Sequence, residues 1–330
     1  MESLPKVSLI ITTFNNEQTI DECLKSVFEL DYPKDLLEVI VVDGGSKDLT
    51  VKKVEKYPAK LIVKPSNAPA AYNYAIKVAR GDIIAILDAD AKVEKDWLNK
   101  LIKHFKDPKV AGVGGRIETW NHQEILPRCI GYDIRYRYRR LLRNGNIRRL
   151  ATMNLLLRRK VLEEVGGFDE SLPTQYDTEI GNRITSKGYR LVFEPDAKCY
   201  HFNRPTWLGY FRQQFQYGKN TLRLYLRNLK LIKGDSITDF GMNIQPLLLF
   251  VAFTSAILGF MSEIRFPLYF SALIIAFLMT YYVISAVKVS AYFKDFTCML
   301  LIVVYFVRAV AWTLGGIFAV LKILSKGRVV

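Results

Sequence analysis

The segment GDIIAILDADAKVEKDW, residues 81–97, joins an apolar run to two carboxylates. Residues 83–87 are five consecutive apolar side chains, which fits a strand buried on both faces. Asp88 and Asp90 follow directly, and an ionised carboxylate buried without a partner is strongly destabilising. We therefore expect water or a cation to meet these acids at the end of the strand.

The chain before this segment repeats the pattern of an apolar run followed by helical spacing. Runs at residues 6–15, 37–48 and 59–65 predict strands, and the spacing at 16–30, 49–57 and 68–80 predicts helices. This alternation indicates a parallel sheet with helices on both faces. Ligands bind at the carboxyl ends of such strands. The polar or aromatic residues expected at those ends are Thr12, Thr13, Phe14, Asn15, Asp43, Asp88 and Asp90.

The paired aspartates indicate a particular chemistry. Carboxylate oxygens are hard ligands suited to Mg²⁺ or Mn²⁺. A cation held by Asp88 and Asp90 could bridge a diphosphate and neutralise the charge on a departing nucleotide. The chain contains neither GxGxxG nor GxxxxGK[ST], which disfavours a dinucleotide-binding or ATP-hydrolysing protein.

A family resemblance rests on five segments taken in order. They are VSLIITTFNN (7–16), VIVVDGGSKDLT (39–50), NYAIKVARGDIIAILDAD (73–90), GGFDESLPTQYDTEIGNRITSKGYRLVFEPDAKCYH (166–201) and FRQQFQYGKN (211–220). Over about residues 5–220 the chain resembles the inverting family 2 glycosyltransferases of GT-A fold. The resemblance implies an α/β fold, in which a Rossmann-like, mostly parallel central sheet is flanked by helices. It also implies a nucleotide-diphosphate sugar as the donor.

The resemblance implies a donor site at the sheet edge. Its nucleotide-sugar-binding residues would be Thr12, Phe14, Asp43, Asn73 and Asp88. Thr12 and Phe14 would line the base pocket, and Asp43 would accept a hydrogen bond from the nucleobase. Ala68 and Pro69 stand where many relatives carry glycine with an arginine nearby, so the donor loop differs.

The metal and the catalytic base are also implied by the resemblance. Asp88 would contact the nucleoside or the metal, Asp90 would ligate Mg²⁺ or Mn²⁺, and His201 would hold the metal or the diphosphate unless it is structural. Asp177 would take the proton from the acceptor hydroxyl. Tyr176 replaces the glutamate that usually precedes this base, and Glu179 is the alternative base.

An arginine-rich segment, residues 132–150, contains seven arginines interleaved with tyrosines. Arginine forks bind phosphate in bidentate fashion, so Arg135 and Arg139 are candidates for a lipid phosphate acceptor. A solvated helix face is the simpler interpretation. Further candidates for the acceptor channel are Gln213, Gln214 and Gln216, although this part only loosely resembles the Gln-x-x-Arg-Trp motif of polysaccharide synthases.

The C-terminal part is largely apolar. Residues 242–261, 266–287 and 296–321 are each long enough to cross a bilayer as a helix. Residues 207–234 mix aromatic, aliphatic and basic side chains, which is typical of amphipathic helices on a membrane surface or of a basic helix packed on its own domain. Arg308 lies inside the third apolar segment, where a charge is unfavourable. Its side chain either has a function, extends to the membrane surface, or pairs with a neighbouring helix.

The membrane topology stays open at this point. With the N-terminal domain in the cytoplasm, three spans would place the basic C-terminus outside, against the positive-inside tendency. Either one segment is re-entrant or the rule is broken there. No cleavable signal peptide is visible at the N-terminus, so we expect a multi-pass cell-membrane protein with a cytoplasmic catalytic domain. The expected domains are 1–205 (GT-A), 206–240 (amphipathic interface helices) and 241–330 (transmembrane, all-α).

The net charge of the chain indicates which chemical class of partner it binds. The net charge is +15, which indicates an anionic partner such as phospholipid, a phosphorylated substrate or nucleic acid. We expect no nucleic acid, because membrane spans would immobilise the protein and the arginines are confined to one segment. The four cysteines show no CxxC spacing, so we expect small buried apolar side chains rather than a zinc site or a disulfide framework.

The leading interpretation is a metal-dependent, membrane-bound glycosyltransferase that acts on a lipid-linked or glycan acceptor. The alternatives are a processive polysaccharide synthase and a non-catalytic nucleotide-sugar-binding membrane scaffold. A non-catalytic protein is disfavoured because the chain retains all four acidic residues of the expected active site, Asp43, Asp88, Asp90 and Asp177.

Overall fold

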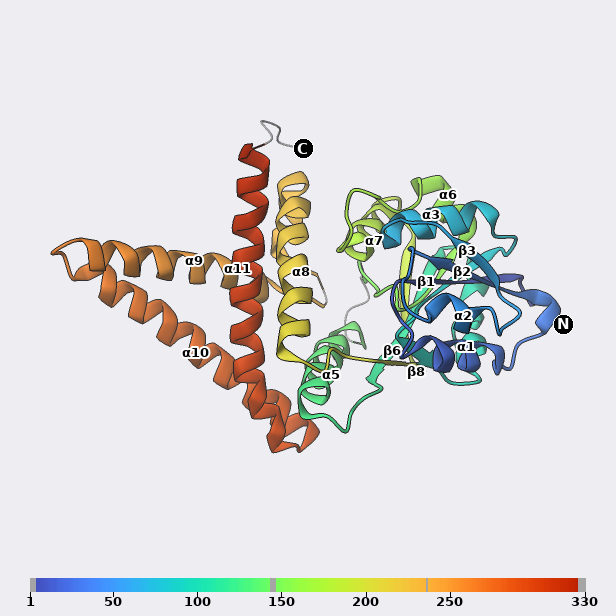
Figure 1. Cartoon of the computed structure of the whole chain (residues 1–330), viewed down its shortest axis with the longest axis horizontal. Coiled ribbons are helices and arrows are strands. Elements are labelled where there is room, and N and C mark those ends of the chain that lie inside the picture. The colour runs from blue at the N-terminus through green and yellow to red at the C-terminus, as the bar shows by residue number, and fades with distance from the viewer. Residues whose placement is uncertain (1–3, 143–146, 236, 326–330) are drawn as a thin grey trace. The chain divides into compact units, whose positions relative to one another are not determined.

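The structure is a computed structural model that describes residues 4–142, 147–235 and 237–325. The chain forms two compact units (Figure 1). The first, here called the α/β unit, contains Met1–Asn121 and Tyr138–Phe202; the second, the helical unit, contains His122–Arg137 and Asn203–Val330. The domain boundaries expected at residues 205 and 240 stay predictions. The grouping of residues 122–137 with the C-terminal helices is a feature that the sequence did not indicate.

The described part of the α/β unit contains one eight-stranded sheet in the order β3-β2-β1-β4-β7-β6-β8-β5. The strands are β1 (Val7–Thr13), β2 (Leu37–Asp43), β3 (Lys60–Val63), β4 (Ile83–Asp88), β5 (Ala91–Val93), β6 (Val110–Thr119), β7 (Asn154–Arg158) and β8 (Arg190–His201). The pairs β1–β2, β2–β3, β1–β4 and β6–β8 are parallel, whereas β7 and β5 pair antiparallel with their neighbours. The predicted Rossmann-like α/β fold is therefore confirmed.

Helices cover both faces of the parallel half of the sheet. They are α1 (Ile20–Phe28), α2 (Thr50–Val54), α3 (Ala68–Val78), α4 (Trp97–Ile102), α6 (Arg159–Val165) and α7 (Tyr176–Ser186), with 3₁₀ turns η1 (Lys34–Leu36), η2 (Lys103–Lys106) and η3 (Arg139–Leu142). Figure 1 shows α1 and α2 on one side of β1–β3, and α3 and α6 on the other. Both faces of β1 and β4 are buried, which explains why their sequences are continuous apolar runs.

A turn held by polar side chains separates β1 from α1. The first helix was expected from residue 16 but starts at Ile20. Asn16 accepts hydrogen bonds from the Thr13 hydroxyl and the Phe14 amide, and Asn15 adopts a left-handed conformation, so the chain turns before the helix begins. This turn leaves Phe14 at the carboxyl edge of the sheet, where the residue is 58% exposed.

The helical unit contains long apolar helices. Its elements are α5 (Ile125–Tyr138, whose last residue belongs to the α/β unit), α8 (Trp207–Arg227), η4 (Leu229–Lys233), α9 (Phe240–Met261), α10 (Phe266–Phe293), η5 (Phe296–Leu300) and α11 (Leu301–Ser325). Three segments in the described chain are long and apolar enough to cross a membrane: Phe240–Met261, Phe266–Phe293 and Phe296–Ser325. They correspond to the three segments expected from the sequence.

Helix α8 packs closely along α11. A Cβ atom added at Gly218 would collide with the backbone of Trp312, and one added at Gly315 would collide with the Phe215 carbonyl. Glycine at these positions therefore permits the two helix backbones to approach each other. The Trp312 indole N–H also donates a hydrogen bond to the Gln214 side chain at 3.0 Å.

We predict that Gly315→Ala destabilises the protein and that its neighbour Gly316→Ala does not. The added methyl group at Gly315 meets backbone atoms, and overpacking of this kind costs about 1–3 kcal/mol. At Gly316 the nearest atom is Leu222 Cδ2 at 3.9 Å, and alanine is the better helix former. Thermal unfolding of the two purified variants in detergent measures the difference. Equal melting temperatures would contradict the α8–α11 packing described above.

A second prediction concerns Glu194, a buried residue of β8. Its carboxylate lies 2.7 Å from Lys103 Nζ and 2.8 Å from His104 Nε2. Burial opposes ionisation, but these hydrogen bonds prevail and lower the pKa of Glu194 to about 2. The unfolded value is about 4.3. The ionised carboxylate therefore adds stability above that pH, and this contribution is lost as the pH falls toward 2.

The melting temperature of the wild type should therefore fall more steeply than that of Glu194→Gln between about pH 5 and pH 3. Glu55→Gln is the control. Glu55 is exposed, so this variant should show the same dependence of melting temperature on pH as the wild type. Parallel curves for wild type and Glu194→Gln would show that the ion pair contributes no pH-dependent stability.

Candidate functional site

The two aspartates of the D-x-D segment and His201 come together at one edge of the sheet. Strand β4 ends at Asp88, and β5 starts three residues later at Ala91, which pairs with His201. The Phe202 amide donates to the Asp90 carbonyl at 2.8 Å, which holds the two segments together. One ligand atom from each of Asp88, Asp90 and His201 lies within 4.8 Å of the others. Two carboxylates and one imidazole fit a divalent metal such as Mn²⁺.

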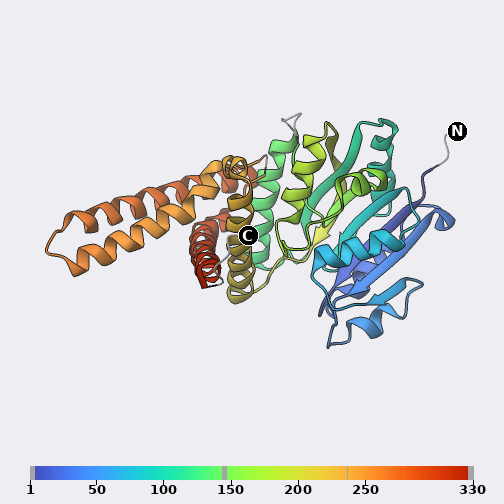
Figure 2. The ribbon, with the colours of Figure 1, turned by 90° about the horizontal axis from the view of Figure 1, so that it is seen from above.

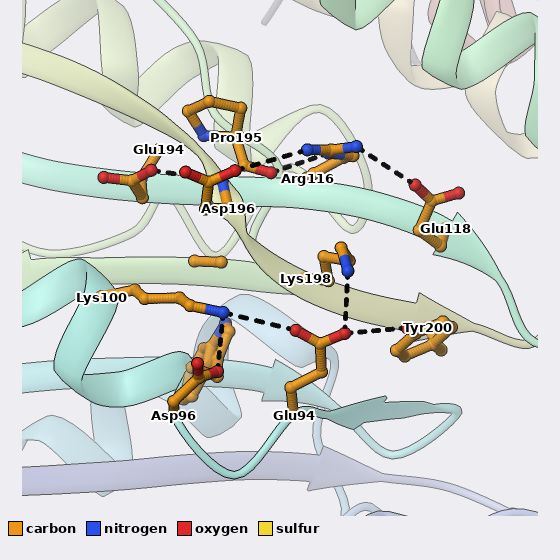
Figure 3. Close-up of polar contacts among 12 residues, drawn as sticks. Glu94, Asp96, Lys100, Arg116, Glu118, Glu194, Pro195, Asp196, Lys198 and Tyr200 are labelled. Carbon is orange, nitrogen blue, oxygen red and sulfur yellow. Dashed lines mark hydrogen bonds and ion pairs between the residues drawn. The ribbon is translucent and has the colours of Figure 1, made fainter.

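Strand β8 reaches this position because polar contacts set its register (Figure 3). The Glu94 carboxylate accepts hydrogen bonds from Lys198 at 3.1 Å and from Tyr200 at 3.0 Å. Nearer the start of β8, the register of its pairing with β6 shifts between Gly115 and Arg116. Arg116 Nε donates to the Pro195 carbonyl at 2.7 Å at this irregularity. Sequence reasoning missed both contacts, although Lys198 and Tyr200 two residues apart share one face of a strand.

The site concentrates negative charge in a buried place. Burial and the neighbouring Asp90 carboxylate raise the pKa of Asp88 to about 6, against the opposing effects of His201 and of the Tyr72 hydroxyl 3.3 Å away. A bound cation would offset this repulsion. Cys23 lies behind the cluster, where burial raises the pKa of its thiol. All four cysteines are buried and free, as the sequence predicted.

The residues expected to bind the nucleotide lie at the same sheet edge. Thr12 is in register with Asp88, and Thr13 with Asp43. Asp43 is fully buried, and its carboxylate accepts hydrogen bonds from the amides of Gly45 (2.9 Å) and Ser46 (2.8 Å) and from the Ser46 hydroxyl (2.5 Å). The Asp43 side chain therefore shapes the Gly-Gly-Ser loop. A hydrogen bond from Asp43 to a nucleobase stays a prediction.

Asn73 holds a loop rather than pointing to solvent. Its amide group donates to the Phe168 carbonyl (2.8 Å) and to Glu170 (2.9 Å), and accepts from the Phe168 amide (2.8 Å). Both amide hydrogens are therefore in use. These bonds connect α3 to the loop that precedes Asp177. A direct contact of Asn73 with the donor stays a prediction.

Asp177 lies in the first turn of α7 and shares an ion pair that the sequence did not indicate. Arg149 Nε lies 2.9 Å from Asp177 Oδ2, and the Thr178 amide donates to Oδ1 at 2.8 Å. The ring of Tyr176, which replaces the usual glutamate, packs edge-on against Tyr72 at 5.9 Å. Because Tyr72 contacts Asp88, this packing connects the start of α7 to the acid cluster, and the Asp177 charge contributes to the raised pKa of Asp88.

The alternative base is engaged elsewhere. Glu179 forms a bidentate ion pair with Arg183, at 2.5 and 2.6 Å. Arg183 also donates to the Gly167 carbonyl at 2.6 Å. Both Glu179 oxygens are thus occupied by one guanidinium group, whereas Arg149 Nε contacts the Oδ2 oxygen of Asp177.

The residues expected at the acceptor site are divided between the two units. Arg139 lies half-buried in η3 of the α/β unit. In the helical unit, Arg135 lies over the Phe293 ring at 5.3 Å, and Gln214 is buried against Trp312. Gln213 is half-buried and Gln216 is exposed. Within the arginine-rich segment, residues 143–146 lie outside the described part of the chain.

The chain is similar to known glycosyltransferases. Residues 8–166 match the glycosyl transferase family 2. The probable glycosyltransferase YdaM of Bacillus subtilis is 31% identical over 246 residues, which is 69% of this chain and 58% of YdaM. The glycosyltransferase AglE of Haloferax volcanii is 29% identical over 232 residues, covering 68% of this chain and 75% of AglE. The chain thus spans little more than half the length of YdaM.

Among solved structures, the mannosyltransferase PcManGT from Pyrobaculum calidifontis, in complex with GDP-Man and Mn²⁺, has a similar fold. The TM-score is 0.61 with 21% sequence identity, and the match covers 96% of this chain and 88% of that one. The family match, the relatives and the eight-stranded α/β architecture agree with one another. Residues 8–166 therefore form a glycosyl transferase family 2 domain, and the α/β unit has the GT-A fold.

Proposed function

We propose that the protein transfers a sugar, with inversion, from a nucleotide-diphosphate sugar to a lipid-linked acceptor at the cytoplasmic face of a membrane. The observation that carries this proposal is the meeting of Asp88, Asp90 and His201 at the carboxyl edge of the sheet. Three candidate membrane helices support the location. The cytoplasmic side rests on the basic residues 203–233 before the first of these helices, which the positive-inside tendency places in the cytoplasm.

The acceptor class is supported by the relatives. A protein of Methanococcus voltae, 27% identical over 234 residues, is named dolichyl N-acetyl-alpha-D-glucosaminyl phosphate 3-beta-D-2,3-diacetamido-2,3-dideoxy-beta-D-glucuronosyltransferase. The poly-beta-1,6-N-acetyl-D-glucosamine synthase of Staphylococcus aureus is 25% identical over 239 residues, and it favours the second candidate function, polymer synthesis. Mild acid separates the two, because it releases a sugar held by a lipid phosphate glycoside but leaves a polymer intact.

Separate residues would bind the metal, stack on the nucleobase and take the proton from the acceptor. Asp88, Asp90 and His201 would hold Mg²⁺ or Mn²⁺, which when bound supplies positive charge against the leaving diphosphate. Phe14, exposed at the sheet edge, offers a flat surface for the nucleobase. Asp177 takes the proton from the acceptor hydroxyl as its oxygen attacks the anomeric carbon, while the bond from that carbon to the diphosphate breaks. Arg149 orients the Asp177 carboxylate through their 2.9 Å contact.

We predict that Asp177→Asn lowers turnover by about 10²–10⁴-fold with little change in donor affinity, because the amide cannot accept the proton. Glu179→Gln should retain most of the activity, since Glu179 is paired with Arg183. Release of nucleoside diphosphate from a panel of nucleotide sugars, with membrane lipid extract as acceptor, measures both. An active Asp177→Asn together with an inactive Glu179→Gln would transfer the role of base to Glu179.

We also predict that Asp90→Asn abolishes the binding of Mn²⁺ at micromolar concentration, because it removes one of two carboxylates. Asp96→Asn is the matched control, since Asp96 is half exposed and pairs with Lys100. Electron paramagnetic resonance of free Mn²⁺ counts the bound ions directly. Wild-type binding by Asp90→Asn would rule out the proposed metal site.

A further inference from the structure

The three apolar helices of the helical unit differ in their surroundings. In the most apolar stretch of α9 and of α10, 22% of the residues are buried, whereas the figure for the segment containing α11 is 50%. Large apolar side chains are exposed along the hairpin formed by α9 and α10, among them Phe253, Phe260, Phe266, Phe270 and Phe277. These two helices therefore have the surface that lipid acyl chains would cover.

The first half of α11 contacts a charged helix. Asp133 of α5 accepts a hydrogen bond from Tyr305 at 2.9 Å and lies 3.4 Å from Arg308, both in α11. Arg137, one turn further along α5, pairs with the same carboxylate at 3.1 Å. Arg308 thus pairs with a neighbouring helix, one of the outcomes that the sequence left open. A helix with these charges would be costly to place at the centre of a bilayer.

The second half of α11 contacts a basic helix. α8 follows it side by side, through the Gln214–Trp312 hydrogen bond and the ammonium group of Lys219, 5.4 Å from the centre of the Phe318 ring. Residues 203–233, which include α8, carry seven Lys or Arg and neither Asp nor Glu. Such charges are strongly unfavourable at the centre of a membrane-spanning helix. Each half of α11 therefore packs against a helix whose charges are unfavourable in the hydrocarbon layer, in addition to its contacts with α9 and α10.

The direction of the helices also separates the α9–α10 hairpin from α8 and α11. Figures 1 and 2 both show the α9–α10 hairpin running crosswise to the α8–α11 pair within the helical unit. Helices that lie crosswise cannot all follow the membrane normal. If the hairpin spans the bilayer, α8 and α11 lie close to its plane.

We propose that only α9 and α10 cross the membrane, and that α8 and α11 form a platform in the headgroup region of the leaflet on the catalytic side. The exposed apolar stripe of α11 would enter the acyl boundary; it contains Phe306, Leu314, Ile317, Leu321 and Leu324. The basic side chains of α8 would contact anionic phospholipid. The C-terminal end of α11 then lies on the same side as the α/β unit, in agreement with its basic sequence. This inference goes beyond the proposed function, and its tests do not measure sugar transfer.

Single-cysteine labelling tests the topology of the full chain. The native cysteines are buried, so the wild type reports the background. A membrane-impermeant maleimide, applied to sealed vesicles of either orientation, should label Ser325→Cys and Asp35→Cys from one side and Glu263→Cys, in the loop between α9 and α10, from the other. Labelling of Ser325→Cys from the side of Glu263→Cys would establish three spans and overturn the proposal.

Depth measurements test the orientation of α11. Phe306 and Leu321 are fifteen residues apart, or about 22 Å of helix at 1.5 Å per residue. Spin labels at Phe306→Cys, Leu314→Cys and Leu321→Cys should report similar shallow depths from their collision rates with oxygen and a nickel chelate. Depths that change steadily along the series would show a spanning helix. Phe277→Cys, in the middle of α10, supplies the reference for a deep position.

Lipid selectivity tests the chemistry of the platform. Wild-type protein in phosphatidylcholine vesicles should immobilise spin-labelled phosphatidylglycerol more than spin-labelled phosphatidylcholine. The variant Arg212→Gln/Arg227→Gln should lose most of this preference, whereas Lys52→Gln/Lys56→Gln, which removes equal charge from the α/β unit, should retain it. Equal immobilisation of both lipids by the wild type would refute an anionic partner.

Discussion

The pairing of β5 with β8 is the contact on which the candidate site depends. β5 has only three residues, Ala91–Val93, and its antiparallel register places His201 opposite the residue that follows Asp90. Without this pairing, the two aspartates would end a strand with no third ligand nearby. The pairing is in turn supported by Glu94, whose carboxylate accepts hydrogen bonds from Lys198 and Tyr200 of β8. A small set of backbone and side-chain bonds therefore brings together residues more than a hundred positions apart.

Compensation of buried charge is a theme common to both units. In the α/β unit, Asp88 and Asp90 lie close together, and burial with mutual repulsion raises the pKa of Asp88, a state that a cation relieves. Asp177 is compensated by Arg149. In the helical unit, Asp133 is compensated by Arg137 and Arg308. The first cluster has an excess of negative charge and suits a metal, whereas the last has an excess of positive charge and joins two helices.

The arginine-rich segment shows how far sequence reasoning reached. The sequence indicates phosphate recognition, because arginines and tyrosines alternate over residues 132–150. In the structure, Arg137 pairs with Asp133 and Arg149 with Asp177, so these two guanidinium groups have partners in the protein. The Asp133–Arg137 pair has the i,i+4 spacing of a helix, whereas the partner of Arg149 could not be identified from spacing, because Arg149 and Asp177 are 28 residues apart. Asn73 is a similar case, because its partners lie 95 and 97 positions away.

The sequence alone determined the order of strands and helices up to residue 90, the acids at the strand ends and the three apolar helices. These features depend on local periodicity and on the length of apolar runs, which are properties of neighbouring residues. Only the tertiary structure decided that His201 joins Asp88 and Asp90, that Arg149 holds Asp177, and that α11 lies against α5 and α8. Those contacts depend on how distant segments pack, and packing is a property of the whole chain that no short stretch of sequence contains.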